Sequence, residues 1–388
     1  MKTKTGIENI MCPKPFWVAL SVLWLVCPSP CPAPLILQKG KGWVYEQAPP
    51  ETGWRRARAK DQFAVATNAL AAGDCVLARK AADRLCSTWP MSDYAGEGAC
   101  LLGRLHATGQ GGARDEKKAR NWLAMIAVSD AMRQSKDRGR YYPVAPVFRQ
   151  HAMLLYLLDR GVLDHASRRL SALRAAAEKG EADAQALLGG LCAVGEGTRK
   201  DAAAARKWLR QAADRRHPGA LYLLGCLEIE TGGSTGLRGE AAQYFRQAAE
   251  LGLASAQFDW AGMNIPAEGD AGQVFPNVFA AARQGFAPAM MLLALDYDHA
   301  LTQADVRSIL AQTSGGQPSE SECRIEGYKW ASVAESQGIE SMKEALAGFK
   351  KSMTREEIAE AKQRAKALLK ELARAEAKQA NRLSAWEK

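Results

Sequence analysis

Residues 184–212 contain the phrase that decides the fold: Ala184-Gln-Ala-Leu-Leu-Gly-Gly-Leu191, then Gly195-Glu-Gly-Thr-Arg-Lys-Asp201, then Ala205-Arg-Lys-Trp-Leu-Arg-Gln-Ala212. The same phrase stands 86 residues earlier, with Gly103, Gly111, Asp115, Ala119 and Trp122 at matching places. It stands again 36 residues later, with Ala220, Gly225, Tyr244 and Ala248 at matching places. Self-similarity at such a period indicates a stack of identical supersecondary units. Stacks of this kind present extended surfaces for binding.

Further units extend the array in both directions. They start at Ala184, Ala220, Ala256 and Ala289, and another occupies 151–180. Earlier helix pairs are expected over 61–72 with 74–86, and over 94–108 with 115–127. The pattern is interrupted near 128–145 and near 298–322, which we interpret as insertions.

The residue types of the repeat suit a pair of packed helices. Gly103, Gly189 and Gly225 supply a small residue where two helix backbones approach closely. The Gly-x-Gly turns allow positive φ, and the aspartates that follow them suit the start of the second helix. We expect the aromatic rings at Trp122, Trp208, Tyr244 and Trp330 to seal each pair as core residues.

This A-x-x-x-L-G, G-x-G, D-x-x-x-A-x-x-W phrase resembles the Sel-one-like repeat, a relative of the tetratricopeptide repeat. The resemblance covers roughly residues 56–380. It implies an all-α, right-handed superhelical solenoid with the first helices on the concave face, and scaffold or adaptor roles in exported bacterial proteins. Asn277 in place of the aromatic and Met342 in place of Ala depart from the pattern.

The amino-terminal segment does not follow the repeat pattern. Lys2, Lys4 and Lys14 precede the apolar run 16–26, and small and proline residues follow it. This is the pattern of a secretory signal over 1–33, whether the chain starts at Met1 or Met11. The run is shorter than the roughly 20 residues that span a bilayer. We therefore expect a periplasmic or secreted protein with no lasting membrane span.

The remaining chain divides into three parts. Residues 34–55 are turn-rich and are expected to be a linker, and 56–353 form the solenoid. Residues 354–388 are expected to form an amphipathic capping helix that begins with a capping box at Thr354 and Glu357. Its apolar positions are Ile358, Ala361, Ala365, Leu368 and Leu372.

Charge and cysteine usage narrow the function classes. The formal net charge of +10 is spread over many helices without a long basic run, so nucleic-acid binding is not expected. No C-x-x-C pair is present, which disfavours a metal site. Both bridged and unbridged states stay open for the six cysteines beyond the signal, Cys75, Cys86, Cys100, Cys192, Cys226 and Cys323.

The register of the related tetratricopeptide repeat places one residue per first helix on the concave face. This predicts a partner-binding stripe of Tyr222, Phe258 and Met291, with Leu295 one turn beyond and Arg104 as a charge contact nearer the other end. Such a stripe suits an extended peptide or a partner helix. The alternative is that curvature buries these side chains against their neighbours.

The predicted function is a non-catalytic scaffold that binds a protein or peptide, as a monomer or weak oligomer, without cofactor or metal. A β-lactamase-like or penicillin-binding protein is the alternative, although the sequence holds no Ser-x-x-Lys. A third possibility is an assembly factor that reaches anionic partners through the carboxy-terminal helix. The cluster Asp296-Tyr-Asp298-His299 is expected to be a solvated helix end.

Overall fold

The computed structural model describes residues 35–38, 42–45, 53–88, 94–136, 146–163, 166–232, 240–263, 274–301, 307–308, 310–311 and 316–383. The predicted signal over 1–33 lies outside them. Strands β1 (Leu35–Gln38) and β2 (Gly42–Tyr45) pair antiparallel, with Leu35 opposite Tyr45. The predicted linker therefore contains a short ribbon, since its β-branched and aromatic residues favour extended backbone.

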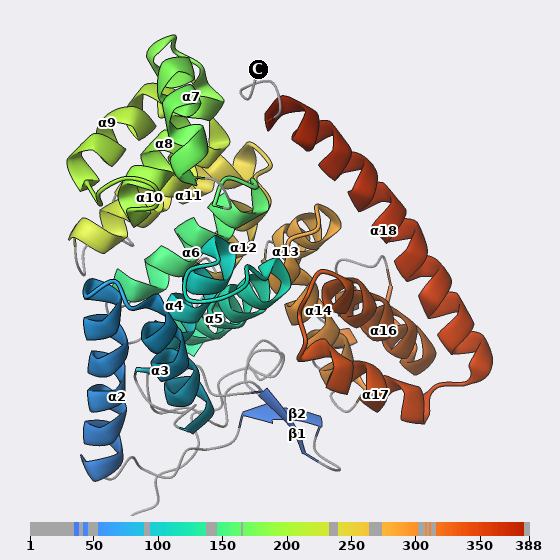
Figure 1. The fold of residues 1–388 in the computed structure, drawn as a ribbon. Coiled ribbons are helices and arrows are strands. Elements are labelled where there is room, and N and C mark those ends of the chain that lie inside the picture. Colours follow the sequence, from blue (N-terminus) through green and yellow to red (C-terminus); the bar gives the residue numbers. More distant parts are fainter. Residues whose placement is uncertain are drawn as a thin grey trace, which may run out of the picture.

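Helix pairs make up the rest of the described chain, and the predicted all-α repeat array is confirmed (Figure 1). The first pairs are α2 (Gly53–Ala71) with α3 (Cys75–Thr88), α4 (Ala95–Thr108) with α5 (Glu116–Lys136), α6 (Pro146–Asp159) with α7 (Ala166–Glu178), and α8 (Ala182–Val194) with α9 (Ala202–Ala213). Then come α10 (Pro218–Gly232) with α11 (Glu240–Glu250), α12 (Ala254–Met263) with α13 (Val274–Arg283), and α14 (Ala287–Ala300) with α16 (Glu320–Ser336). Helices α17 (Met342–Ser352) and α18 (Arg355–Leu383) both pack on α16.

Glycine at one fixed position lets the two helices of a pair touch. A Cβ on Gly189 would lie 2.6 Å from Leu209 Cγ, and one on Gly103 would lie 2.7 Å from the equivalent Leu123. The buried side chain facing the glycine is thus the residue after the repeat aromatic. Trp122, Trp208 and Tyr244 themselves are only partly buried, whereas Trp330 is fully buried.

The turns within the pairs follow the sequence pattern. Gly195 and Gly197 have φ of 76° and 68°, and Gly109 and Gly111 both have φ of 75°. Asp201 caps α9 by accepting hydrogen bonds from the backbone N–H groups of Ala203 and Ala204, each at 2.9 Å. Left-handed backbone at the glycines and a side-chain cap at the aspartate are what the Gly-x-Gly and Asp pattern predicts.

Helices α8 and α14 are enclosed on nearly all sides. Every residue of α8 from Ala184 to Val194 is buried, and α14 is buried almost throughout. A helix that is apolar all round belongs inside a protein. Enclosure is completed by the curvature of the array, which brings α5 against α12 and α14 (Figure 1).

The carboxy-terminal helix closes the stack. Glu357 Oε2 accepts from the Thr354 N–H at 2.9 Å, and Thr354 Oγ1 accepts from the Glu357 N–H at 3.2 Å, so the predicted capping box is present. Leu372 lies against the turn glycine Gly285, where a Cβ would be 3.0 Å from its Cδ2. Ala361 and Ala365 are buried on α16, and the opposite face is exposed.

Two boundaries differ from the sequence expectation. Helix α5 runs to Lys136, into the segment interpreted as the first insertion, and α14 runs to Ala300, past the expected start of the second. Of the helices that the structure describes, none has the length and apolarity to cross a bilayer.

Candidate functional site

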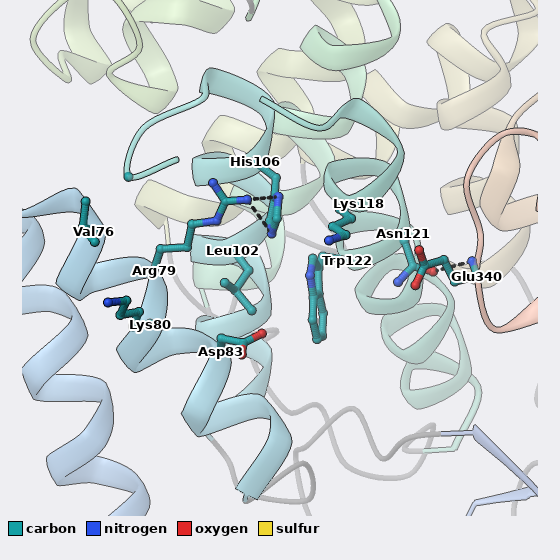
Figure 2. Close-up of a pocket in the computed structure, with 11 residues that line it drawn as sticks. Val76, Arg79, Lys80, Asp83, Leu102, His106, Lys118, Asn121, Trp122 and Glu340 are labelled. Atoms are coloured by element: carbon teal, nitrogen blue, oxygen red, sulfur yellow. Dashed lines mark hydrogen bonds between the residues drawn. The ribbon is translucent and has the colours of Figure 1, made fainter. Parts of the chain in front are cut away.

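A cleft of about 520 Å³ opens among α3, α4 and α5 (Figure 2). Each helix contributes one face to the lining. The lining residues of α3 are three, four and seven positions apart in the sequence, those of α4 are four positions apart, and those of α5 lie within about one turn. The loop before α17 closes one side. The lining residues are Val76, Arg79, Lys80, Asp83, Leu102, His106, Gly111, Lys118, Asn121, Trp122 and Glu340.

Arg79 occupies the middle of the cleft. Its Nη2 lies 2.6 Å from His106 Nδ1, and its Nη1 donates to the Ala113 carbonyl at 3.2 Å. The pKa of His106 lies below its usual value, first because the ring is buried and then because Arg79 and Lys118 are nearby. Because a guanidinium can only donate, the ring nitrogen nearest to it acts as the acceptor, and the lowered pKa of His106 favours the neutral ring that this contact needs.

The Gly-x-Gly turn after α4 builds one wall of the cleft. A Cβ on Gly111 would lie 2.1 Å from the Cys75 carbonyl oxygen, and one on Gly112 would lie 2.6 Å from Arg79 Nη1. The absence of side chains lets this turn lie directly on the start of α3. The turn thereby positions the Arg79 head group.

Charge on the cleft surface is mixed, with cations at the centre. Lys80 and Lys118 are exposed beside Arg79, and Asp83 and Glu340 stand exposed at the edges. Several half-buried arginines of the array pair with a carboxylate, as Arg206 does with Glu228 at 2.8 Å. Both hydrogen-bond acceptors of Arg79 are neutral groups, and among the described residues the carboxylate that shares its cleft wall, Asp83, lies one helical turn along α3 without forming an ion pair with it.

Glu340 comes from the far end of the chain. Its backbone N–H donates to Asn121 Oδ1 at 3.0 Å, across 219 residues. The neighbouring Arg120 donates to the Gln337 carbonyl at 3.4 Å and pairs with Asp159 at 3.2 Å. One wall of the cleft thus depends on the closure of the array.

The structure places the predicted stripe inside the stack. Tyr222, Phe258 and Met291 are each 1 % exposed, and Leu295 is fully buried. The Tyr222 hydroxyl donates to Asp259 Oδ2 at 2.9 Å. The observed packing is the alternative in which curvature buries these side chains, and their role in partner binding stays a prediction.

Arg104 lies apart from the cleft. Its Nε forms an ion pair with Glu196, a carboxylate whose side chain is only 4 % exposed. Burial raises the pKa of Glu196, and Arg104 opposes that shift. The guanidinium predicted as a partner contact thus binds α4 to the turn after α8.

The Asp296–His299 segment is not a solvated helix end. Asp296 is 3 % exposed and His299 is 2 % exposed, because α14 continues to Ala300 and is covered by α16. Burial raises the pKa of Asp296 well above its usual value. Burial thus disfavours the charged form of this carboxyl group.

Most cysteines of the described chain are buried thiols. No disulfide joins the six of them there, and all except Cys75 are buried. Burial raises the pKa of Cys86 and of Cys100 to about 12. The described residues also contain no group of three or more His, Cys, Asp or Glu side chains placed to hold a metal ion.

Sequence reasoning did not find the cleft. Helical spacing on α3 and α5 is visible in the sequence, yet nothing there shows that Arg79 donates to the His106 ring and the Ala113 carbonyl. Glu340 could not be assigned either, because its contact with Asn121 depends on curvature accumulated over the whole array.

Comparison with known proteins agrees with the repeat pattern. Residues 96–127, 182–217 and 218–253 match the Sel1 repeat, which is the Sel-one-like repeat, and these segments correspond to α4–α5, α8–α9 and α10–α11. No curated protein matches the chain.

Two solved structures are similar at low identity. A Sel1 repeat protein from Oxalobacter formigenes is 19% identical over 75% of each chain, with a TM-score of 0.37. A protective antigen of uropathogenic Escherichia coli with an SLR fold is 14% identical over 84% of this chain and 87% of its own, with a TM-score of 0.22.

Proposed function

We propose that this chain, which carries Sel1 repeats, is a non-catalytic scaffold that binds a protein partner across the cleft between α3, α4 and α5. Sel1 repeats are typical of protein-interaction scaffolds. The cleft lining supports binding rather than covalent chemistry, since it includes no Ser, Thr or Cys nucleophile.

The observation that carries the proposal is the arrangement around Arg79. Three helix faces and a distant loop converge on a cation held by neutral partners, beside the partly buried ring of Trp122. Interface residues that dominate binding energies are enriched in Arg and Trp. The buried stripe of Tyr222 and Phe258 is less accessible to a partner, and alanine there would change stability before it changed contact.

The proposed location is the periplasm or the secreted space. The basic and apolar pattern over 1–33 supports export. Fractionation of the producing cell, with amino-terminal sequencing of the mature chain, tests it. A mature chain that retains residues 1–33 in the cytosol would contradict it.

A cell-wall enzyme is the weaker candidate. No observation favours it, and the sequence contains no Ser-x-x-Lys. Hydrolysis of a chromogenic cephalosporin by the purified protein would reverse this preference.

Site-specific photo-crosslinking tests the scaffold proposal. A benzoylphenylalanine at Trp122 is expected to capture a partner in living cells. The matched control is the same substitution at Tyr244, the equivalent position of a later repeat, which is also partly buried but lies outside the cleft. Equal adducts from both positions, or none from Trp122, would overturn the proposal.

A further inference from the structure

We infer that the cleft recognises an acidic peptide segment, with a carboxylate on Arg79 and a neighbouring apolar side chain on Val76 and Trp122. The inference rests on the proposed scaffold function and names the chemistry of its partner. It follows from three independent features of the cleft.

The first feature is the state of Arg79. The guanidinium is half-buried, and the contacts at its two terminal nitrogens are the neutral His106 ring and the Ala113 carbonyl. These contacts orient the planar head group without neutralising it. An oriented, partly desolvated guanidinium binds a carboxylate more strongly than a freely moving surface cation does.

The second feature is the apolar surface next to this cation. Val76, which lines the cleft, is 51% exposed at the start of α3, although most apolar side chains of the array are buried. Trp122 adds a partly buried ring on the other side of the cleft. Figure 2 shows Val76 and Trp122 on opposite sides of Arg79. An apolar side chain beside the ligand carboxylate would cover this surface.

The third feature distinguishes a peptide from a polyanion. Asp83 and Glu340 line the cleft on either side of the cations and would repel a second or third negative charge. Lys80 and Lys118 are exposed and attract an acidic partner from a distance. A peptide with a single carboxylate beside an apolar residue complements this mixture of positive and negative side chains better than a phosphate backbone does.

An array of ten-residue peptides tests the inference on the full-length protein. Each peptide carries one Leu and one Glu, one to four residues apart, in a Gly-Ser background, and matched peptides carry Gln in place of Glu. We expect the Glu peptides to bind at least tenfold more tightly than the Gln peptides. Inorganic phosphate and a short RNA serve as competitors and are expected to compete weakly.

Variants locate the binding site. Arg79→Gln is expected to abolish the preference for Glu, and Arg79→Lys to retain part of it. Arg84→Gln removes the same charge from an exposed position of α3 outside the cleft, so it should leave binding unchanged. Lys118 is exposed on α5, so we expect Lys118→Gln to leave the fold intact and to weaken Glu-peptide binding severalfold.

Several outcomes would overturn the inference: equal binding of Glu and Gln peptides, no binding of either, unchanged preference in Arg79→Gln, or stronger binding of the RNA. The crosslink from position 122 separates the two proposals. A crosslink without preference for Glu leaves the scaffold in place with a different partner chemistry. Loss of the crosslink itself removes the scaffold proposal.

Discussion

The backbone N–H of Glu340 donates a hydrogen bond to the side chain of Asn121 at 3.0 Å, joining a loop near the end of the array to its second repeat. Beside it, Gly338 has φ of 101°, and a Cβ there would lie 2.7 Å from Lys117 Cα. The two backbones are in contact, and this contact holds Glu340 at the edge of the cleft.

Gly338→Ala is expected to open this contact. The added methyl group meets backbone atoms that cannot turn aside, so the free energy of unfolding should fall by about 1–3 kcal/mol more than backbone strain alone would cause. Gly252→Ala provides the strain control, since Gly252 has φ of 85° and no atom within 4 Å of its added Cβ. Urea unfolding gives the energies, and hydrogen exchange at the Glu340 amide reports the contact. Equal losses in both variants would contradict the interpretation.

Gly189→Ala tests the close approach within a repeat. A Cβ there would lie 2.6 Å from Leu209 Cγ, whereas one on Gly225 would lie 3.0 Å from the edge of the Phe245 ring. We expect Gly189→Ala to destabilise by about 1–3 kcal/mol through overpacking, although alanine favours a helix. Gly225→Ala should destabilise the protein less than Gly189→Ala does. The double variant Gly189→Ala, Leu209→Ala should cost less than the sum of its parts, because Leu209 is the residue displaced.

Asp201→Ala removes the amino-terminal cap of α9. Two backbone N–H groups lose their acceptor, and the expected loss of stability is about 1 kcal/mol. Asp214→Ala, at the other end of the same helix, is the matched control. A negative charge there opposes the helix dipole, so its removal should be neutral or slightly stabilising. Thermal unfolding of the two variants should therefore show opposite or clearly unequal shifts.

His106 should make stability fall as the solution becomes acidic. Its pKa is lowered in the folded protein, first by burial and then by the positive charges of Arg79 and Lys118, with Asp115 and Asp83 opposing. Below the ordinary pKa of 6.5, the unfolded chain therefore binds a proton that the folded chain resists, and stability is lost as pH falls. His106→Gln keeps an acceptor for Arg79 and should remove this part of the acid sensitivity. If the free energy of unfolding depended on pH in the same way in both proteins between neutrality and pH 5, His106 would be excluded as the source of this acid sensitivity.

Glu357 should make the stability of the protein depend on pH in a lower range than His106 does. Hydrogen bonds from Arg324 and Ser321 lower the pKa of this capping-box carboxyl from 4.5 to about 2. Its contribution to stability is complete above pH 4.5 and is lost as pH falls toward 2. Glu357→Gln should therefore be less stable than the parent at neutral pH and approach it as the pH falls below 4.5. Glu356→Gln, at an exposed position in the same first turn, loses only an interaction with the helix dipole and should therefore show a smaller difference from the parent than Glu357→Gln does.

The amino-acid sequence by itself determined the repeat and its local geometry. Gly189, the Gly195–Gly197 turn and the Asp201 cap interact within a single repeat, so their roles follow from spacing and backbone preference alone. The expected burial of the aromatic is confirmed for Trp330, whereas in the repeats with Gly103, Gly189 and Gly225 the residue after the aromatic faces the glycine and the aromatic itself is partly buried. Helical periodicity alone does not fix whether Trp208 or the adjacent Leu209 points most directly at the glycine.

Only the tertiary structure decided which surfaces stay accessible. The curvature of the array is a sum of small rotations between neighbouring repeats, and no single repeat encodes that sum. It buried Tyr222 and Phe258, for which the sequence left an open face and a buried position as alternatives, and it brought Glu340 to Asn121. The wall of the cleft that Glu340 forms therefore depends on a contact between distant parts of the chain, which local sequence patterns do not record.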